Sequence, residues 1–533
     1  MAGGADLQTA SPAAGLRFAL TERQLVRDHM KSPEELISDL TVAIHHDPRL
    51  GYPKKPPYSP HLRYPEYRLQ HLGQEENNVY DAIREILCLL GLDRENVETP
   101  SWNPFKEIIR PGDTVLIKPN FVLDRHDTGG DLFSIITHPS VIRAMVDYVH
   151  IALAGNGRII IADAPQMDCN FQVLMAETNL DSIRELYQRE HGFFIEIYDL
   201  RSFWLDTSGS NKAYSNARHS LPGDPAGSVE VDLGRDSLFY GQRGESRYYG
   251  ADYDRQRCCQ HHHGEVQRYL LSRTVLSADV IISIPKLKVH KKVGVTLNTK
   301  GLVGISTDKN YLVHYRLGTP AEGGDQFPDH LLSAREQATV RLQRWAFDRL
   351  LAKKSARADL LYDGLLRAGK LVLKPLGFGL ARERATLDAG NWHGNDSAWR
   401  MAVDLLRILL YADKDGKMGS SPTRSMLCVV DGIVGGEGNG PLTPTAKRCG
   451  VIVAGFNPGA VDLVCTRLMG YDFRRIKTIS HQLLHPEVFG VRQAGIRVSS
   501  NWCDTTNLLA PANKSRYLDF LPHPGWVGSI EVD

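Results

Sequence analysis

The residues of this chain that are best suited to chemistry lie between Ala278 and Gly304, where an apolar run is followed by a cluster of cations. They are the clustered cations Lys286, Lys288, His290, Lys291, Lys292 and Lys300. Crowded lysines lower one another's pKa, and a lysine with a lowered pKa can act as a base or nucleophile near neutral pH. We therefore predict that the catalytic residues are Lys286, Lys288, His290 and Lys300, with the histidine as acid/base partner. Clamping of a phosphate or carboxylate is the alternative use, which we favour over covalent catalysis because one base does not need three or more cations.

Short apolar segments indicate the sheet that positions these cations. Residues 280–284 (VIISI) are β-branched and end at Pro285, as expected of a strand buried on both faces of a parallel sheet. Residues 114–117 and 158–162 predict two more strands with a helix over 139–153 between them, which makes one βαβ unit. Residues 426–430 and 450–454 predict two late strands, the second leading into a helix capped by Asn457.

Polar side chains follow each of the predicted strands. They are Lys118 and Asn120 after the first, Asp163 after the second, Lys286 to His290 after the third, Asp431, Glu437 and Asn439 after the fourth, and Asn457 and Asp462 after the fifth. Because parallel strands end on one rim, we expect these side chains to converge on a single crevice. For any one position, chance placement of a polar loop residue is the alternative.

A glycine-rich segment over residues 431–440 (DGIVGGEGNG) is the second strong feature. Its glycines let backbone amides approach a ligand closely, so the segment predicts an anion-binding loop in which Gly438 and Asn439 contact the substrate. It is not a Walker loop, because no GK[ST] follows, and Pro441 and Pro444 exclude a GxGxxG turn that opens a helix. A purely structural turn is the alternative.

Four carboxylates at the predicted strand ends suit a divalent cation. They are Asp163, Asp431, Glu437 and Asp462. Hard oxygen ligands favour magnesium, usually beside substrate phosphates, so these carboxylates predict a magnesium ion that assists the reaction. A reaction without a metal is the alternative. Asp462 lies in the first turn of its predicted helix, where a cap or a helix-dipole partner explains it equally well.

Two further segments contribute predicted substrate-binding residues. His138 precedes a helix N-terminus and either caps that helix or contacts an anion. Residues 391–396 (NWHGND) combine an aromatic platform with amides, as sugar-binding segments do, so we add Trp392, His393 and Asn395. A helix-capping turn would explain this segment but not its tryptophan and histidine.

Composition narrows the class of protein. The 533 residues carry a net charge of +1, which argues against a general nucleic-acid binder. The eight cysteines form no CxxC pair, so we expect no iron–sulfur cluster. Because the sequence shows neither a signal peptide nor an apolar run that could span a bilayer, we expect a cytoplasmic protein. The stretch from Leu350 to Arg384 mixes leucines with lysines and suits a membrane surface, a partner or a solvated lid.

Several motifs resemble a known family. LIKPNF, ITHPSVIRAM, ADVIISIPKLKVH, LNTKGLVG, VVDGIVGGEGNGP and AGFNPGAVDLVCTRLMG occur in the order found in the family called domain of unknown function 362. The resemblance covers roughly residues 79–471. We also count Asn298, within LNTKGLVG, among the predicted substrate-binding residues. Many members carry a ferredoxin-type cysteine cluster, which this chain lacks. A weaker likeness, at the level of the fold, is to lactate racemase relatives, which have a His and a Lys spaced like His290 and Lys300.

These observations predict an α/β protein with a doubly wound, mostly parallel sheet in two lobes with helical insertions. We expect an N-terminal extension with a Pro/Tyr-rich strap over 1–110, a first lobe over 111–310, a helical insertion or lid over 311–425, and a second lobe with a tail over 426–533. The predicted function is an enzyme that acts on a phosphorylated or carboxylate-bearing small molecule by Lys/His acid–base chemistry. A non-catalytic anion-binding or scaffold protein and a nucleotide-dependent transferase or ligase are the alternatives.

Overall fold

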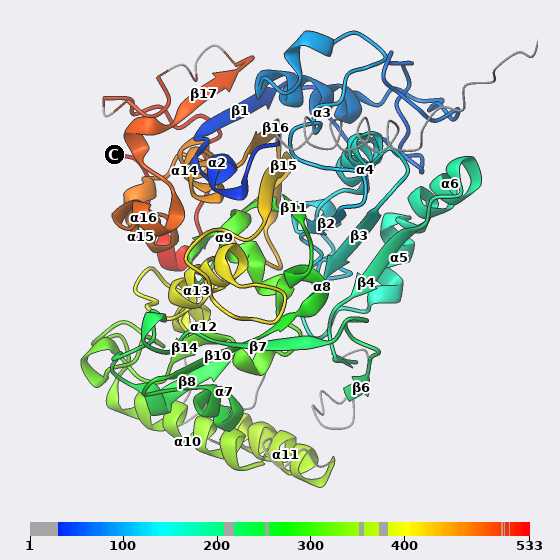
Figure 1. Ribbon diagram of the computed structural model, residues 1–533. Helices are drawn as coiled ribbons and strands as arrows, with labels where there is room; N and C mark the ends of the chain where they lie inside the picture. Colours follow the sequence, from blue (N-terminus) through cyan, green and yellow to red (C-terminus); the bar gives the residue numbers. More distant parts are fainter. Residues whose placement is uncertain are drawn as a thin grey trace, which may run out of the picture.

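A mixed, mostly parallel sheet with helices on both faces forms the body of the molecule (Figure 1). The computed structural model describes residues 30–206, 218–250, 255–350, 356–372 and 382–533, the last range without 503, 504, 506 and 511. The strand order is β17-β1-β16-β15-β11-β2-β3-β4. These strands are β1 (Thr41–His46), β2 (Thr114–Pro119), β3 (Arg158–Asp163), β4 (Ile195–Asp199), β11 (Val280–Ile284), β15 (Ser425–Glu437), β16 (Thr445–Gly455) and β17 (Arg497–Ser500). The predicted fold class is confirmed.

Alternation along the central strands creates two hydrophobic cores, one on each face of the sheet. In β11, Val280 and Ile282 point to one core and Ile281 to the other. Successive side chains of a strand point to opposite faces, so a strand covered by helices on both sides is apolar throughout. The helices of the first core's face are α3 (Asn78–Leu89), α4 (Pro139–Leu153) and α6 (Asp181–His191). Those of the other face include α13 (Ala398–Tyr411), α14 (Pro458–Leu468) and α15 (Lys477–Leu484).

The predicted βαβ unit is present with its helix bounds as expected. α4 begins at Pro139 after the cap residue His138, whose side chain accepts a hydrogen bond from the Ser140 N–H, and ends before Ala154, which has a left-handed backbone. Strands β2 and β3 pair in parallel on either side of this connection in the chain. Of the two predicted roles of His138, the structure shows the helix cap.

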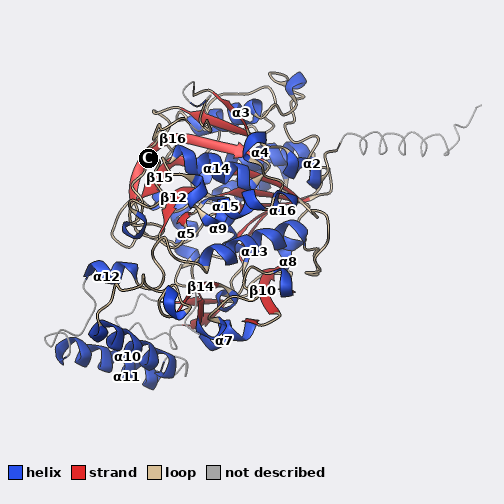
Figure 2. Cartoon of the chain, turned by 90° about the vertical axis from the view of Figure 1, so that its left-hand side faces the viewer, coloured by secondary structure: helices blue, strands red, loops and turns tan. Residues whose placement is uncertain are grey.

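Smaller elements surround the sheet. The short helices are α2 (Pro33–Ser38), α5 (Phe171–Thr178), α7 (Arg255–His261), α8 (Arg273–Leu276), α9 (Leu297–Gly301) and α16 (Pro486–Phe489). The remaining strands are β5 (Phe203–Leu205), β6 (Arg218–Ser220), β7 (Ser228–Asp232), β8 (Tyr248–Gly250), β9 (His262–His263), β10 (Val266–Ser272), β12 (Lys286–His290), β13 (Gly294–Val295) and β14 (Val313–Arg316). The predicted insertion contributes α10 (Ala334–Leu350), α11 (Ala356–Val372) and α12 (Arg382–Leu387), which lie off the body (Figure 2).

Two predicted loops are strands, which corrects the sequence interpretation. The glycine-rich segment forms the second half of β15, where residues 434–437 pair with β16 and Glu437 lies opposite Thr445. Pro285 does not end the sheet either, because β12 follows it and pairs in parallel with β15. Glycine suits this strand because neighbours approach closely: a Cβ on Gly432 would lie 2.6 Å from the Val451 side chain. Through β15 and β16, the predicted second lobe shares one sheet with the first.

Candidate functional site

A cavity of about 1220 Å³ opens beyond the carboxyl ends of β2 and β3. Residues 120–127 follow β2 and residues 163–170 follow β3, and both segments line the cavity. β12, α9 and β14 supply the other walls, with Arg344 of α10 at one side. The cavity therefore lies where a parallel sheet places its ligands.

Five lysines line this cavity. They are Lys288, Lys291, Lys292, Lys300 and Lys309. None of them forms an ion pair with a carboxylate among the residues that the structure describes. By contrast, Arg125 on the same wall is paired with Asp124 and Asp168. Five aspartates also line the cavity, so its seven lysines and arginines exceed its carboxylates by two.

Lys300 is the lysine best placed to react. It lies in the last turn of α9 and is 7 % exposed, and burial lowers its pKa to about 7. Within the described ranges, no hydrogen bond or ion pair of its ammonium group is found. A lysine with a pKa near 7 is a free amine in about half of the molecules at neutral pH, so it can accept a proton there.

His290 stands close enough to Lys300 for their charges to interact. Burial first, and then the charge of Lys300, hold the pKa of His290 well below its ordinary value, so the imidazole is neutral. Its Nδ1 accepts a hydrogen bond from the Lys292 N–H at 3.0 Å, which leaves the proton on Nε2. The cavity therefore combines a lysine that can take a proton with a neutral imidazole that can donate a hydrogen bond.

Lys288 and Lys309 are held by backbone carbonyls. Lys288 Nζ donates to the carbonyl oxygens of Ile135 at 2.7 Å and Pro441 at 3.3 Å. Lys309 Nζ donates to those of Ala164 at 2.9 Å and Val303 at 2.8 Å. Burial lowers the pKa of Lys309 to about 7, but carbonyl acceptors favour the charged form. These two side chains are fixed in place, which suits charge complementarity better than proton transfer.

An ion pair behind the cavity wall fixes the ends of β2 and β3. Lys118 Nζ lies 3.0 Å from Asp163 Oδ1, and both side chains are buried. Asp163 Oδ2 also accepts the N–H of Phe121 at 2.7 Å. Asp163 and Asn120 line the cavity, whereas Lys118 is not among the lining residues.

A second buried network holds three of the predicted site residues away from the cavity. Lys286 Nζ lies 3.0 Å from Asp431 Oδ2 and donates to Tyr52 Oη at 2.5 Å, and Tyr52 stacks on His138 with 4.0 Å between ring centroids. The backbone N–H of His138 donates to Asp431. Lys286, Asp431 and His138 do not line the cavity. This network joins the Pro/Tyr-rich strap to the sheet and is structural.

Asp462 positions the segment that carries Lys300. Its carboxylate accepts hydrogen bonds from the backbone N–H and side chain of Asn298 and from those of Thr299. Burial raises the pKa of Asp462 to about 6 despite these donors. Asn298 and Asp462 therefore tie α14 to α9 within two residues of Lys300, and neither residue lines the cavity.

The remaining predicted residues also lie outside the cavity lining. They are Gly438, Asn439, Glu437, Trp392, His393 and Asn395. Glu437 pairs with Lys447 at 2.9 Å, and Asn439 bonds to Thr443. Asn395 accepts the N–H groups of Ser397 and Ala398 at the start of α13, and Trp392 donates to the Asp325 carbonyl. The segment 391–396 is thus the helix-capping turn.

The four carboxylates predicted to bind magnesium do not come together as one ligand set. Asp163, Asp431, Glu437 and Asp462 each have a separate partner, as described above. In the described residues no group of three or more His, Cys, Asp or Glu side chains is placed to hold a metal ion. Asp163 is the one of the four that lines the cavity.

Sequence reasoning missed several cavity residues. Lys309 and His314 follow Lys300 in the chain, and the alternation of β14 turns His314 toward the cavity. Arg344 comes from α10 and lies over the rings of Tyr249 and Tyr315, 5.4 Å and 5.8 Å from their centroids. A polar residue in a strand pattern was a usable signal for His314, but no local signal marks Arg344.

The fold is that of an α/β protein, and five lysines line its cavity. Residues 239–467 match the family described as Domain of unknown function (DUF362), which confirms the resemblance and places this part of the chain in that family. No curated protein and no solved structure matches the chain. The weaker likeness to lactate racemase relatives is not confirmed. No helix of the described residues is long and apolar enough to cross a bilayer.

Proposed function

We propose that this protein is an enzyme that binds an anionic small molecule in the lysine-lined cavity and transfers a proton within it. The observation that carries the proposal is that five lysines surround one cavity without carboxylate partners among the described residues. Burying cations without counter-charges is unfavourable. A phosphate or carboxylate group would supply the missing charge and would raise the pKa of the lysines around it.

The division of labour follows from the contacts of each side chain. Lys288 and Lys309, which carbonyls hold, clamp the anion. Lys300 is the base, because its pKa of about 7 gives a free amine at neutral pH. His290 donates its Nε2–H to a substrate oxygen while remaining neutral. If magnesium takes part, Asp163 is the predicted ligand that reaches the cavity wall.

Binding alone is the main alternative. A binding or scaffold protein needs cations but has no use for a lysine whose pKa lies near 7. Backbone carbonyls accept hydrogen bonds from Lys288 and Lys309, whereas the ammonium group of Lys300 has no such acceptor among the described residues. This difference favours a chemical role for Lys300. Cytoplasmic location forms part of the proposal as well, since the proposed substrate class is that of small metabolites.

Differential scanning fluorimetry with a ligand panel tests the proposal. The panel contains nucleotides, sugar phosphates and hydroxy acids, each with and without magnesium, and the proteins are wild type, Lys300→Met and the control Lys54→Met, which changes an exposed lysine outside the cavity. An anion that raises the melting temperature of wild type and of the control but not of Lys300→Met supports the site. If no anion shifts the wild type, the proposed function is wrong.

The bound anion then separates catalysis from binding. Proton exchange at the ligand, followed by NMR in deuterated water, is expected with wild type and not with Lys300→Met. A ligand that binds tightly but never exchanges a proton or turns over would leave a binding protein and overturn the enzymatic proposal.

A further inference from the structure

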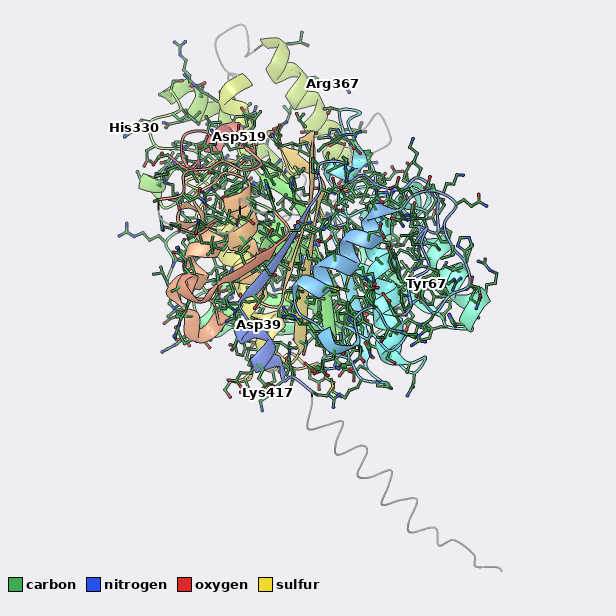
Figure 3. All side chains as sticks on the ribbon, turned by 90° about the horizontal axis from the view of Figure 1, so that it is seen from above. Asp39, Tyr67, His330, Arg367, Lys417 and Asp519 are labelled. Atoms are coloured by element: carbon green, nitrogen blue, oxygen red, sulfur yellow. The ribbon has the colours of Figure 1, made fainter. Side chains whose placement is uncertain are left out.

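The helices α10 and α11 expose large apolar side chains on the part of the molecule that stands off the body (Figure 2). On α10 these are Leu342 and Trp345, which are 55 % and 59 % exposed and lie three residues apart on one face. On α11 they are Leu360, Leu361, Leu365 and Leu371, with exposures between 52 % and 77 %. Viewed from above, α11 with Arg367 lies at the edge of the molecule, far from Asp39 (Figure 3). We refer to α10 and α11 as the helical pair.

The exposed leucines of α11 form one stripe. At 3.6 residues per turn, Leu360, Leu371, Leu361 and Leu365 fall within an arc of about 140°. Arg357 and Arg367 are exposed and lie within or beside this arc. An apolar stripe with arginines on its border is the pattern of a helix that lies in a membrane interface, because the arginine head groups can reach past the apolar layer to the lipid phosphates.

Contacts with neighbouring segments fix the inner side of α10. Val340 of α10 is buried against Phe327 and Leu332. Arg344 pairs with Asp388, and Arg384 pairs with Glu336. Leu342 and Trp345 therefore lie on the outer face of an anchored helix, and α11 packs against that helix.

The charge of this segment is opposite to that of the rest of the chain. Residues 334–384 hold twelve Lys and Arg against five Asp and Glu, a net charge of +7, whereas the whole chain has 63 and 62. The remainder accordingly carries −6. Such a contrast steers the segment toward a negatively charged surface and turns the body away from it.

We propose that the helical pair binds the surface of an anionic lipid bilayer, with the leucine stripe and Trp345 in the interface and the cations at the phosphate level. Apolar side chains at six exposed positions do not suit nucleic acid, whose backbone is met by cations and hydrogen-bond donors. An acidic protein would complement the positive charge of the helical pair but does not explain why the leucine stripe is exposed. The proposal does not rest on the proposed function of the cavity.

Vesicle flotation with the full chain tests this proposal. The probes are vesicles of phosphatidylcholine alone and of phosphatidylcholine with phosphatidylglycerol. The variant is Leu361→Glu/Leu365→Glu, and the matched control is Leu484→Glu/Leu521→Glu, which changes two leucines of 75 % and 61 % exposure elsewhere. We expect wild type and control to float with the anionic vesicles only, to detach at high salt, and the variant to bind about tenfold or more weakly.

Three results would overturn the proposal. The first is a wild type that stays in solution with anionic vesicles. The second is a variant that floats as well as the control. The third is light scattering in which wild type and the control are dimers and the variant is a monomer. A second copy of the chain, and not a bilayer, would then cover the leucines. Circular dichroism of the variant checks that α10 and α11 remain helical.

Discussion

Replacing Lys300 by methionine is expected to stabilise the protein, and the gain should depend on pH. Methionine has a similar length and carries no charge, so the change removes a cation from a buried site while keeping its volume. Lys300 has an ordinary pKa of 10.5 in the unfolded chain and of about 7 in the folded protein. That difference corresponds to roughly 5 kcal/mol of unfavourable free energy when the lysine is charged.

The sign of the pH dependence follows from proton linkage. Below pH 7 both states of wild type are protonated at Lys300, so the full cost of roughly 5 kcal/mol applies. Between pH 7 and 10.5 the unfolded chain binds more protons than the folded protein, so the stability of wild type rises with pH. The advantage of Lys300→Met should therefore shrink from roughly 5 kcal/mol at pH 6 to about 1 kcal/mol at pH 9.5.

Urea denaturation at the two pH values measures this difference, because urea does not screen charge as guanidinium does. The quantity compared is the free energy of unfolding of Lys300→Met minus that of wild type. Titration of the other buried lysines largely cancels in this difference, since both proteins contain them. A gain of the same size at pH 6 and pH 9.5, or a loss at both, would refute the lowered pKa of Lys300.

Three further results are expected. Lys286→Met should lower the free energy of unfolding in urea titrations by about 3–5 kcal/mol, because it leaves the carboxylate of Asp431 buried and unpaired. The double variant Lys286→Met/Asp431→Leu should recover most of that loss, and equal losses in both proteins would contradict the ion pair. Gly304→Ala should lower the free energy of unfolding by roughly 1–3 kcal/mol, seen as a lower melting temperature, because the added Cβ would clash with Asp163 and lie 2.8 Å from Lys118 Nζ. Calorimetry should show anion affinity falling as pH rises through about 7, where Lys300 loses its charge; an affinity that does not change with pH would remove Lys300 from the site.

The sequence predicted the fold where local patterns and tertiary packing agree. Residues 280–284 are apolar except for Ser283, and they form the central strand β11 that is buried on both faces. The helix over 139–153 was recognisable because His138 and Pro139 are strong start signals. The glycine-rich segment was predicted wrongly as a loop, since glycine usually ends strands. In β15 the glycines have no side chain, which lets neighbouring residues pack close to the strand. No local sequence pattern reveals that those neighbours lie so close.

The site could be predicted only in part. Lys288, His290 and Lys300 reach the cavity together with Asn120 and Asp163. The other predicted residues lie outside the cavity lining for one shared reason: a buried polar side chain needs a partner, and most polar residues at strand ends find it within the protein. Asp431 takes Lys286, and Asp462 takes the backbone of α9. Whether a charge is paired or left over depends on distant residues, so the surplus of cations emerges only from the folded chain.

The position of β1 has a consequence for the synthesis of this protein. β1 lies between β16 and β17, and its partner β17 follows it by about 450 residues in the chain. At roughly 5–20 residues per second, a ribosome delivers that partner about 20–90 s after β1. During this interval the edge of residues 41–46 is an open template for pairing with other chains. Correct folding of the whole molecule therefore depends on keeping this short strand unpaired until translation is nearly finished.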